Sequence, residues 1–114
     1  MKTINLNAWG TNHPISFYLD NYAENNNLYV GLITTEDGYA EPWSDLTVNL
    51  GDKLPANCAY IDTNDNGQQI IEWLVKNKLG EPTGAYGFSG FCSYPLFEFD
   101  MDELSKYLIA EDQQ

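Results

Sequence analysis

Apolar and polar residues alternate with a period of two through much of the first half of the chain, and this pattern constrains the fold more than any other feature. It runs through residues 4–8, 15–19 and 28–32. Successive side chains of a β-strand point to opposite faces, so the pattern predicts three strands that each bury one face. Residues 25–27 and 36–38 are rich in Asn, Asp and Gly and are predicted to form turns.

Three later segments continue the β pattern. Residues 46–50 alternate in the same way, and residues 58–62 ("CAYID") and 94–99 ("YPLFEF") are short apolar runs. Together with the first three segments they predict an antiparallel sheet of about five to six strands.

One helix is predicted between the last two of these strands. Apolar residues at helical spacing occupy positions 70–75, and Asn66 with Gln69 matches a capping box at its start. Gly80 follows as a stop signal. After the final strand, Asp100 and Glu103 are expected to cap a short C-terminal helix.

The chain has 114 residues, of which 43% are apolar and 14% aromatic. This is enough for one domain with a modest core. We therefore expect residues 1–114 to form a single α+β domain, in which one helix packs on an antiparallel sheet and a short helix ends the fold.

Charge restricts the possible partners. Five lysines and no arginine stand against 17 carboxylates, and the net charge is −12. Nucleic-acid affinity depends on Lys and Arg contacts to phosphate, so direct nucleic-acid binding is not expected. An acidic chain is steered towards basic protein surfaces. Acidity also serves solubility, and that simpler interpretation stays open.

No apolar run reaches the roughly 18 residues that span a bilayer. Asn5, Asn7 and Asn12 interrupt the N-terminal segment, which therefore does not read as a signal peptide. We expect a cytoplasmic protein that does not enter membranes. In that compartment Cys58 and Cys92 are expected to be free thiols.

The glycine-rich segment "LGEPTGAYGFSGFCSYPL" at residues 79–96 is not expected to bind phosphate. Its glycines are Gly80, Gly84, Gly87 and Gly90. A P-loop needs Lys and Ser or Thr directly after its last glycine, at the start of a helix, and this segment has no cation. The segment is predicted to be a structural loop that connects the helix to the next strand and turns on its glycines.

No metal, cofactor or catalytic site is predicted. The run "DTNDNG" at residues 62–67 resembles half of a calcium loop, but its twelfth position is Trp73, so a turn with a helix cap is favoured. His13 is the only histidine, and a zinc site or a Cys92–His13 dyad has no local motif. We expect a protein that is not an enzyme.

Two acidic groups are the candidate partner-binding site, together with nearby aromatic rings. The C-terminal acidic group is Glu98, Asp100, Asp102 and Glu103. The central acidic group is Glu36, Asp37, Glu41 and Asp45. Trp43 and Tyr94 lie near these groups in sequence, and aromatic rings beside carboxylates suit an Arg- or Lys-rich partner. The alternative is that these rings only complete a small core.

Three segments carry a family resemblance: "AEPWSDLTVNL", "LPANCAYIDTND" and above all "LGEPTGAYGFSGFCSYPLFEFDMDEL". They resemble a small acidic family of unknown function carried by phages and conjugative elements of Gram-positive gut bacteria. The resemblance covers roughly residues 2–108. The family in turn resembles type II-A anti-CRISPR proteins. It implies a non-enzymatic inhibitor that occupies the basic guide-RNA or DNA channels of Cas9.

Two alternatives stay open beside that expectation. A small-molecule binder that sequesters a defence signal would use Tyr86, Phe88 and Phe91 to line a pocket. An accessory scaffold of the mobile element would need neither site. The sequence does not fix the oligomeric state.

Overall fold

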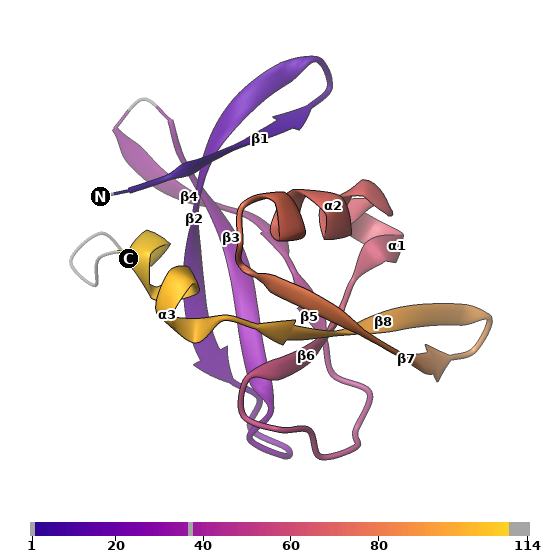
Figure 1. Ribbon diagram of the computed structural model, residues 1–114. Coiled ribbons are helices and arrows are strands. Elements are labelled where there is room, and N and C mark those ends of the chain that lie inside the picture. The colour runs from indigo at the N-terminus through magenta and orange to yellow at the C-terminus, as the bar shows by residue number, and fades with distance from the viewer. Residues whose placement is uncertain (1, 37, 110–114) are drawn as a thin grey trace.

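The computed structural model describes residues 2–36 and 38–109. Within them the chain forms two four-stranded antiparallel sheets with short helices between and after the later strands (Figure 1). The first sheet is a meander in the order β1-β2-β3-β4. Its strands are β1 (Ile4–Ala8), β2 (Thr11–Asn21), β3 (Leu28–Glu36) and β4 (Tyr39–Asp45).

The second sheet has the order β5-β6-β8-β7. Its strands are β5 (Thr47–Val48), β6 (Cys58–Ile61), β7 (Gly80–Ser89) and β8 (Cys92–Phe99). The chain between β6 and β7 contains α1 (Thr63–Asn66) and α2 (Gln69–Lys76). After β8 it forms α3 (Met101–Leu104) and the 3-10 turn η1 (Ser105–Tyr107).

One core joins the two sheets and the helices. In β2, the predicted alternation places Ile15 and Phe17 in this core and leaves Tyr18 half-exposed on the other face. In the second sheet, the rings of Phe97 and Phe99 pack edge to face with their centroids 4.9 Å apart, an arrangement that aromatic rings favour. The largest fully buried side chains are Phe17, Phe97, Phe99, Ile15, Leu32, Leu46, Ile61, Ile70, Leu74, Leu79, Leu104 and Val30.

The α+β class is confirmed, but the strands form two sheets of four rather than the single sheet of five to six strands that was predicted. The sequence prediction missed β4, which carries Glu41, Pro42 and Asp45 and lies at the edge of its sheet. Charged residues and proline are tolerated on edge strands, where one face and one row of backbone groups meet water. The sequence of β4 therefore lacks the alternation of apolar and polar residues by which the other strands were predicted.

The glycine-rich segment was predicted to be a loop between helix and strand. In the structure it is a β-hairpin of β7 and β8. A two-residue turn joins them, with Gly90 at φ 60°. The strand register shifts between Pro82 and Tyr86, and β7 is an edge strand. Proline and glycine weaken a central strand, but an edge strand with a bulge accepts both.

The predicted capping box is also wrong. Asn66 ends α1, and its side-chain amide donates to the backbone oxygens of Asp45 (3.0 Å) and Asp62 (2.9 Å). The cap of α1 is Asp62, whose carboxylate accepts from the backbone N–H of Asp65 at 3.0 Å. The cap at Asp100 is confirmed, because its carboxylate accepts from the backbone N–H of Glu103 at 3.1 Å.

Gly80 was predicted to end a helix, but it begins β7, where the backbone of Glu98 and Phe99 leaves no room for a Cβ. Both cysteines are free: Cys58 is buried and Cys92 is half-buried. None of the helices in the described part of the chain is long and apolar enough to cross a membrane.

Candidate functional site

The carboxylates have few cationic partners within the fold. In the described part of the chain, ion pairs join His13 Nδ1 to Glu36 Oε1 at 2.7 Å and Lys106 Nζ to Glu103 Oε1 at 2.6 Å. Some of the other described carboxylates accept hydrogen bonds from neutral donors, as Asp45 does from Tyr29 and Asp52 from Tyr60. Most of the negative charge is therefore left for a partner or for counter-ions.

The C-terminal acidic group follows the end of β8 into α3. Glu98 and Asp102 are exposed. Asp100 is tied to the backbone as the cap of α3, and Glu103 is tied to Lys106. Within residues 2–36 and 38–109, Glu98 and Asp102 are thus the carboxylates of this group without an ion-pair or capping partner.

Glu81 belongs to the same surface, although the sequence analysis did not include it. In the β7–β8 ladder Glu81 is paired directly with Glu98, and both side chains are exposed. Side chains that face each other in an antiparallel pair point to the same side of the sheet. The two-residue turn alone would not have identified this neighbour, because its register, continued without the bulge, places Thr83 opposite Glu98.

A hollow of about 470 Å³ adjoins this acidic pair. Three carboxylates and one cation line it, and the lining residues are Val75, Lys78, Gly80, Glu81, Glu98, Phe99 and Asp100. The acidic surface is therefore an open hollow rather than an enclosed pocket.

The central acidic group does not form one patch among the described residues. Glu36 is paired with His13, and the Asp45 carboxylate accepts from the Tyr29 hydroxyl at 2.5 Å. Burial, followed by this hydrogen bond and the charge of Asp45, raises the pKa of Tyr29 well above its ordinary value. Glu41 is exposed on β4, while Asp37 lies outside the described residues.

Trp43 and Tyr94 lie in different clusters. Tyr94 packs beside the small cluster of Leu54, Cys58 and Tyr60 on the second sheet. Trp43 packs against His13, with ring centroids 4.5 Å apart. The structure therefore does not bring these two predicted site residues together.

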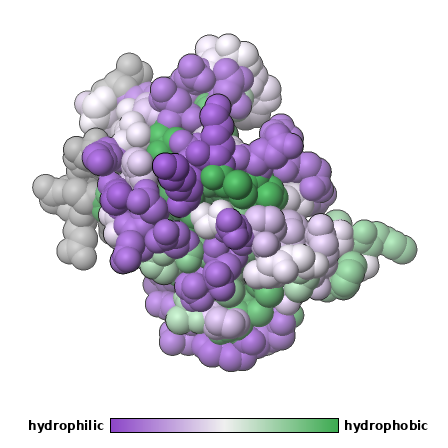
Figure 2. All heavy atoms as spheres, viewed as in Figure 1, coloured by the Kyte–Doolittle hydropathy of each residue, from purple (hydrophilic) through white to green (hydrophobic). Residues whose placement is uncertain are grey.

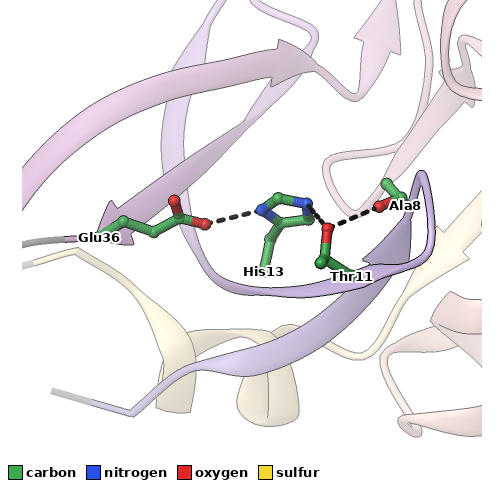
Figure 3. Close-up of polar contacts among 4 residues, drawn as sticks. All are labelled: Ala8, Thr11, His13 and Glu36. Carbon is green, nitrogen blue, oxygen red and sulfur yellow. Dashed lines mark hydrogen bonds and ion pairs between the residues drawn. The ribbon is translucent and has the colours of Figure 1, made fainter.

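The imidazole of His13 packs against Trp43 and makes polar contacts through both ring nitrogens. Its Nδ1 faces Glu36, and its Nε2 lies 3.3 Å from the hydroxyl of Thr11, which donates to the carbonyl of Ala8 (Figure 3). These polar contacts restrain the imidazole, and the imidazole packs against the indole of Trp43.

Trp9 is a second site residue that the sequence analysis missed. Its indole lies 5.6 Å from that of Trp43 and is 89% exposed. The two rings line a hollow of about 740 Å³ between the β1–β2 hairpin, β4 and the α1–α2 segment. The lining residues are Leu6, Asn7, Ala8, Trp9, Trp43, Ser44, Asn64, Asp65, Asn66, Gly67, Gln69 and Ile70. A Trp before Gly between two predicted strands was the available signal.

Three aromatic residues of the glycine-rich segment face solvent, namely Tyr86, Phe88 and Phe91. Phe88 is 73% exposed, and Phe91 in the turn is fully exposed. The hairpin projects from the body in Figure 1, and hydrophobic atoms occupy that projection in Figure 2. Tyr86, Phe88 and Phe91 do not line either hollow described above.

The residues considered as metal ligands have other roles in the fold. The run at residues 62–67 forms α1 with Asp62 as its buried cap, and His13 is bonded to Glu36. Across residues 2–36 and 38–109 no three His, Cys, Asp or Glu side chains gather as a metal site would require.

Comparison with the curated proteins and with the solved structures gives no match. A family model described as a domain of unknown function (DUF4313) matches residues 16–112. The match begins within β2 and takes in both acidic groups and the glycine-rich hairpin, whereas Trp9 precedes it. The chain therefore belongs to the DUF4313 family.

Proposed function

We propose that the protein is a non-enzymatic inhibitor that binds a basic surface of another protein through the carboxylates around Glu81 and Glu98. The observation that carries this proposal is the pairing of these two exposed glutamates across adjacent strands. Like charges directly opposite each other oppose folding. A cation from a partner that lies between them removes this repulsion and adds attraction, so the pair favours binding more than it favours the isolated fold.

The charge of the whole chain supports the same function. A net charge of −12 accelerates encounters with a basic groove and disfavours nucleic acid as the direct partner. The resemblance to proteins of mobile elements makes a counter-defence role in the host cytoplasm part of the proposal. Cas9 is the first partner to test, because it holds its guide RNA and heteroduplex in positively charged channels.

The experiment is a binding and cleavage assay with purified Cas9, with and without guide RNA. The test variant is Glu81→Gln/Glu98→Gln. The control variant is Glu24→Gln/Glu72→Gln, which changes the net charge by the same amount at exposed positions outside the site. We expect the test variant to weaken binding about tenfold at low salt and the control to change it far less.

The wild-type affinity should also fall steeply as salt rises. Equal effects of the two variants would show that only total charge matters and would remove the proposed site. An absence of binding to several Cas9 proteins would remove Cas9 as the partner. The same variant pair would then be assayed against other basic host defence proteins.

A further inference from the structure

Trp9 has a backbone conformation that is unusual for a large side chain. Trp9 and Gly10 form the two-residue turn between β1 and β2, with φ of 52° and 80°. Turns with two positive φ values favour Asn, Asp and Gly. A bulky residue there is a true outlier, and such outliers gather at functional sites. Because the ring is also 89% exposed, burial in this fold does not account for its presence.

The two tryptophans form one wall of the 740 Å³ hollow. Their rings are tilted by 49° to each other. The indole of Trp43 packs against the imidazole of His13, whereas Trp9 touches Trp43 and is otherwise exposed at the hairpin turn. One aromatic face is thus fixed in advance and the other is available to close on a ligand.

The opposite wall carries polar side chains with unused hydrogen-bonding groups. Asn66 is occupied, since its amide oxygen accepts from the Ser44 hydroxyl at 2.7 Å. Asn64, Asp65 and Gln69 make no side-chain hydrogen bond to the described part of the chain. Among the described residues of this lining, Asp65 is the one acidic side chain and none is a lysine.

We infer that this hollow binds the guanidinium group of an arginine side chain, supplied by a basic partner protein. The inference deepens the proposed function and rests on it for the origin of the arginine. A cation is attracted to the face of an aromatic ring, most strongly to Trp. The planar guanidinium stacks on the indoles and presents its N–H donors to Asp65 and to the amide oxygens. A neutral ligand would only donate hydrogen bonds to the Asp65 carboxylate, whereas a guanidinium also neutralises its charge.

The test is a titration followed by NMR of the indole N–H groups. The chain has three tryptophans, and Trp73 Nε1–H donates to the carbonyl of Asn5 at 2.8 Å, so its signal is an internal reference. The probes are N-acetyl-arginine amide, its lysine counterpart and its citrulline counterpart, which is planar but neutral. We expect the arginine probe to shift the Trp9 and Trp43 signals, with binding about tenfold tighter than for citrulline.

Two variants locate the effect. Trp9→Ala should abolish the response of Trp43, and Asp65→Asn should weaken arginine binding several-fold without altering the fold. Glu72→Gln removes an exposed carboxylate that is not in the lining, and it should leave arginine binding unchanged. An equal effect of Glu72→Gln would show general charge attraction and would overturn the inference.

Three other outcomes are decisive. Equal binding of citrulline, or of the neutral sugar maltotriose, would show a pocket for neutral ligands and overturn the inference. An absence of any indole response, while Glu81→Gln/Glu98→Gln still weakens partner binding, would remove the inference and leave the proposed function standing. Arginine binding in the hollow, with partner binding indifferent to Glu81 and Glu98, would support the inference and remove the proposed acidic surface.

Discussion

Glu81 on β7 lies directly opposite Glu98 on β8, and no cation is ion-paired with either in the described part of the chain. Their repulsion predicts that Glu81→Gln stabilises the isolated protein by about 0.3 kcal/mol, since exposed charge pairs have effects of this size. Urea denaturation at low salt measures this gain, which should shrink in 0.5 M salt because ions screen the repulsion. Glu24→Gln, at an exposed loop position, is the control. A loss of stability in Glu81→Gln would contradict the interpretation.

Sequence reasoning was sufficient where one face of a strand is buried against the core. The alternation in β2 identified Ile15 and Phe17 as core residues, and both are fully buried. It failed for β7, in which Gly87 is the one buried residue and nearly all the others are exposed. An edge strand that is exposed to solvent on both faces does not need alternating apolar and polar residues. Its strand character follows from pairing with β8, which no local pattern reveals.

The candidate site was predictable in charge and unpredictable in geometry. The acidic character of residues 98–103 follows from composition, but the inclusion of Glu81 depends on the register of the hairpin. The Trp9–Trp43 hollow depends on two hairpin segments and α1 meeting in space. Contacts between residues that are more than thirty positions apart arise from the tertiary fold, so the local sequence pattern did not reveal them.

The strain at Trp9 gives a direct test. Trp9→Asn and Trp9→Ala both remove the ring and its contact with Trp43, but only Asn suits a positive φ at this turn. Trp9→Asn should therefore be more stable than Trp9→Ala by about 0.5–1 kcal/mol. Both variants should lose arginine binding in the hollow to the same extent. Equal midpoints of chemical denaturation for the two variants would show that the turn imposes no such preference.

Gly80 is predicted to be far less replaceable than Gly84. A Cβ at Gly80 would overlap the carbonyl oxygen of Glu98 and lie 2.9 Å from the Cα of Phe99, and its φ is 151°. Gly80→Ala should destabilise the protein by about 3 kcal/mol or more, because backbone atoms must move. At Gly84 φ is 91°, but nothing lies within 4 Å, so Gly84→Ala should cost only about 1 kcal/mol of conformational strain. Thermal unfolding of both variants compares them, and similar losses would refute the packing argument.

The two cysteines are expected to differ in reactivity. Cys58 is 4% exposed, and burial together with the charge of Glu98 raises the pKa of its thiol. The thiolate is the reactive form, so iodoacetamide at pH 8 should modify Cys92 at least about tenfold faster than Cys58. Mass spectrometry of digested protein gives both rates, and Cys58→Ser is the control that isolates Cys92. In urea the two rates should become equal; equal rates in the native protein would rule the burial argument out.

The raised pKa of Tyr29 should make the free energy of unfolding depend on pH at high pH. Its hydroxyl donates to Asp45, and its folded-state pKa is raised above the ordinary value of 10.0, first by burial and then by this bond and charge. Above about pH 10 the unfolded chain loses the Tyr29 proton while the folded protein keeps it. The unfolded state then binds fewer protons, so the free energy of unfolding falls as pH rises through this range, and the contribution is complete below it.

Replacement of Tyr29 by Phe should therefore lower the free energy of unfolding more at neutral pH than at high pH. At pH 7, Tyr29→Phe should lose about 1 kcal/mol with the hydrogen bond to Asp45. Between pH 9 and 11 its stability should fall less steeply than that of the wild type, so the two curves converge. A residual slope is expected, because the pKa values of Tyr22 and Tyr60 are also raised. Asp45→Asn, which keeps an acceptor but removes the charge, should give an intermediate slope. Urea unfolding at each pH measures all three proteins, and parallel curves would show that Tyr29 titrates alike in the folded and unfolded states.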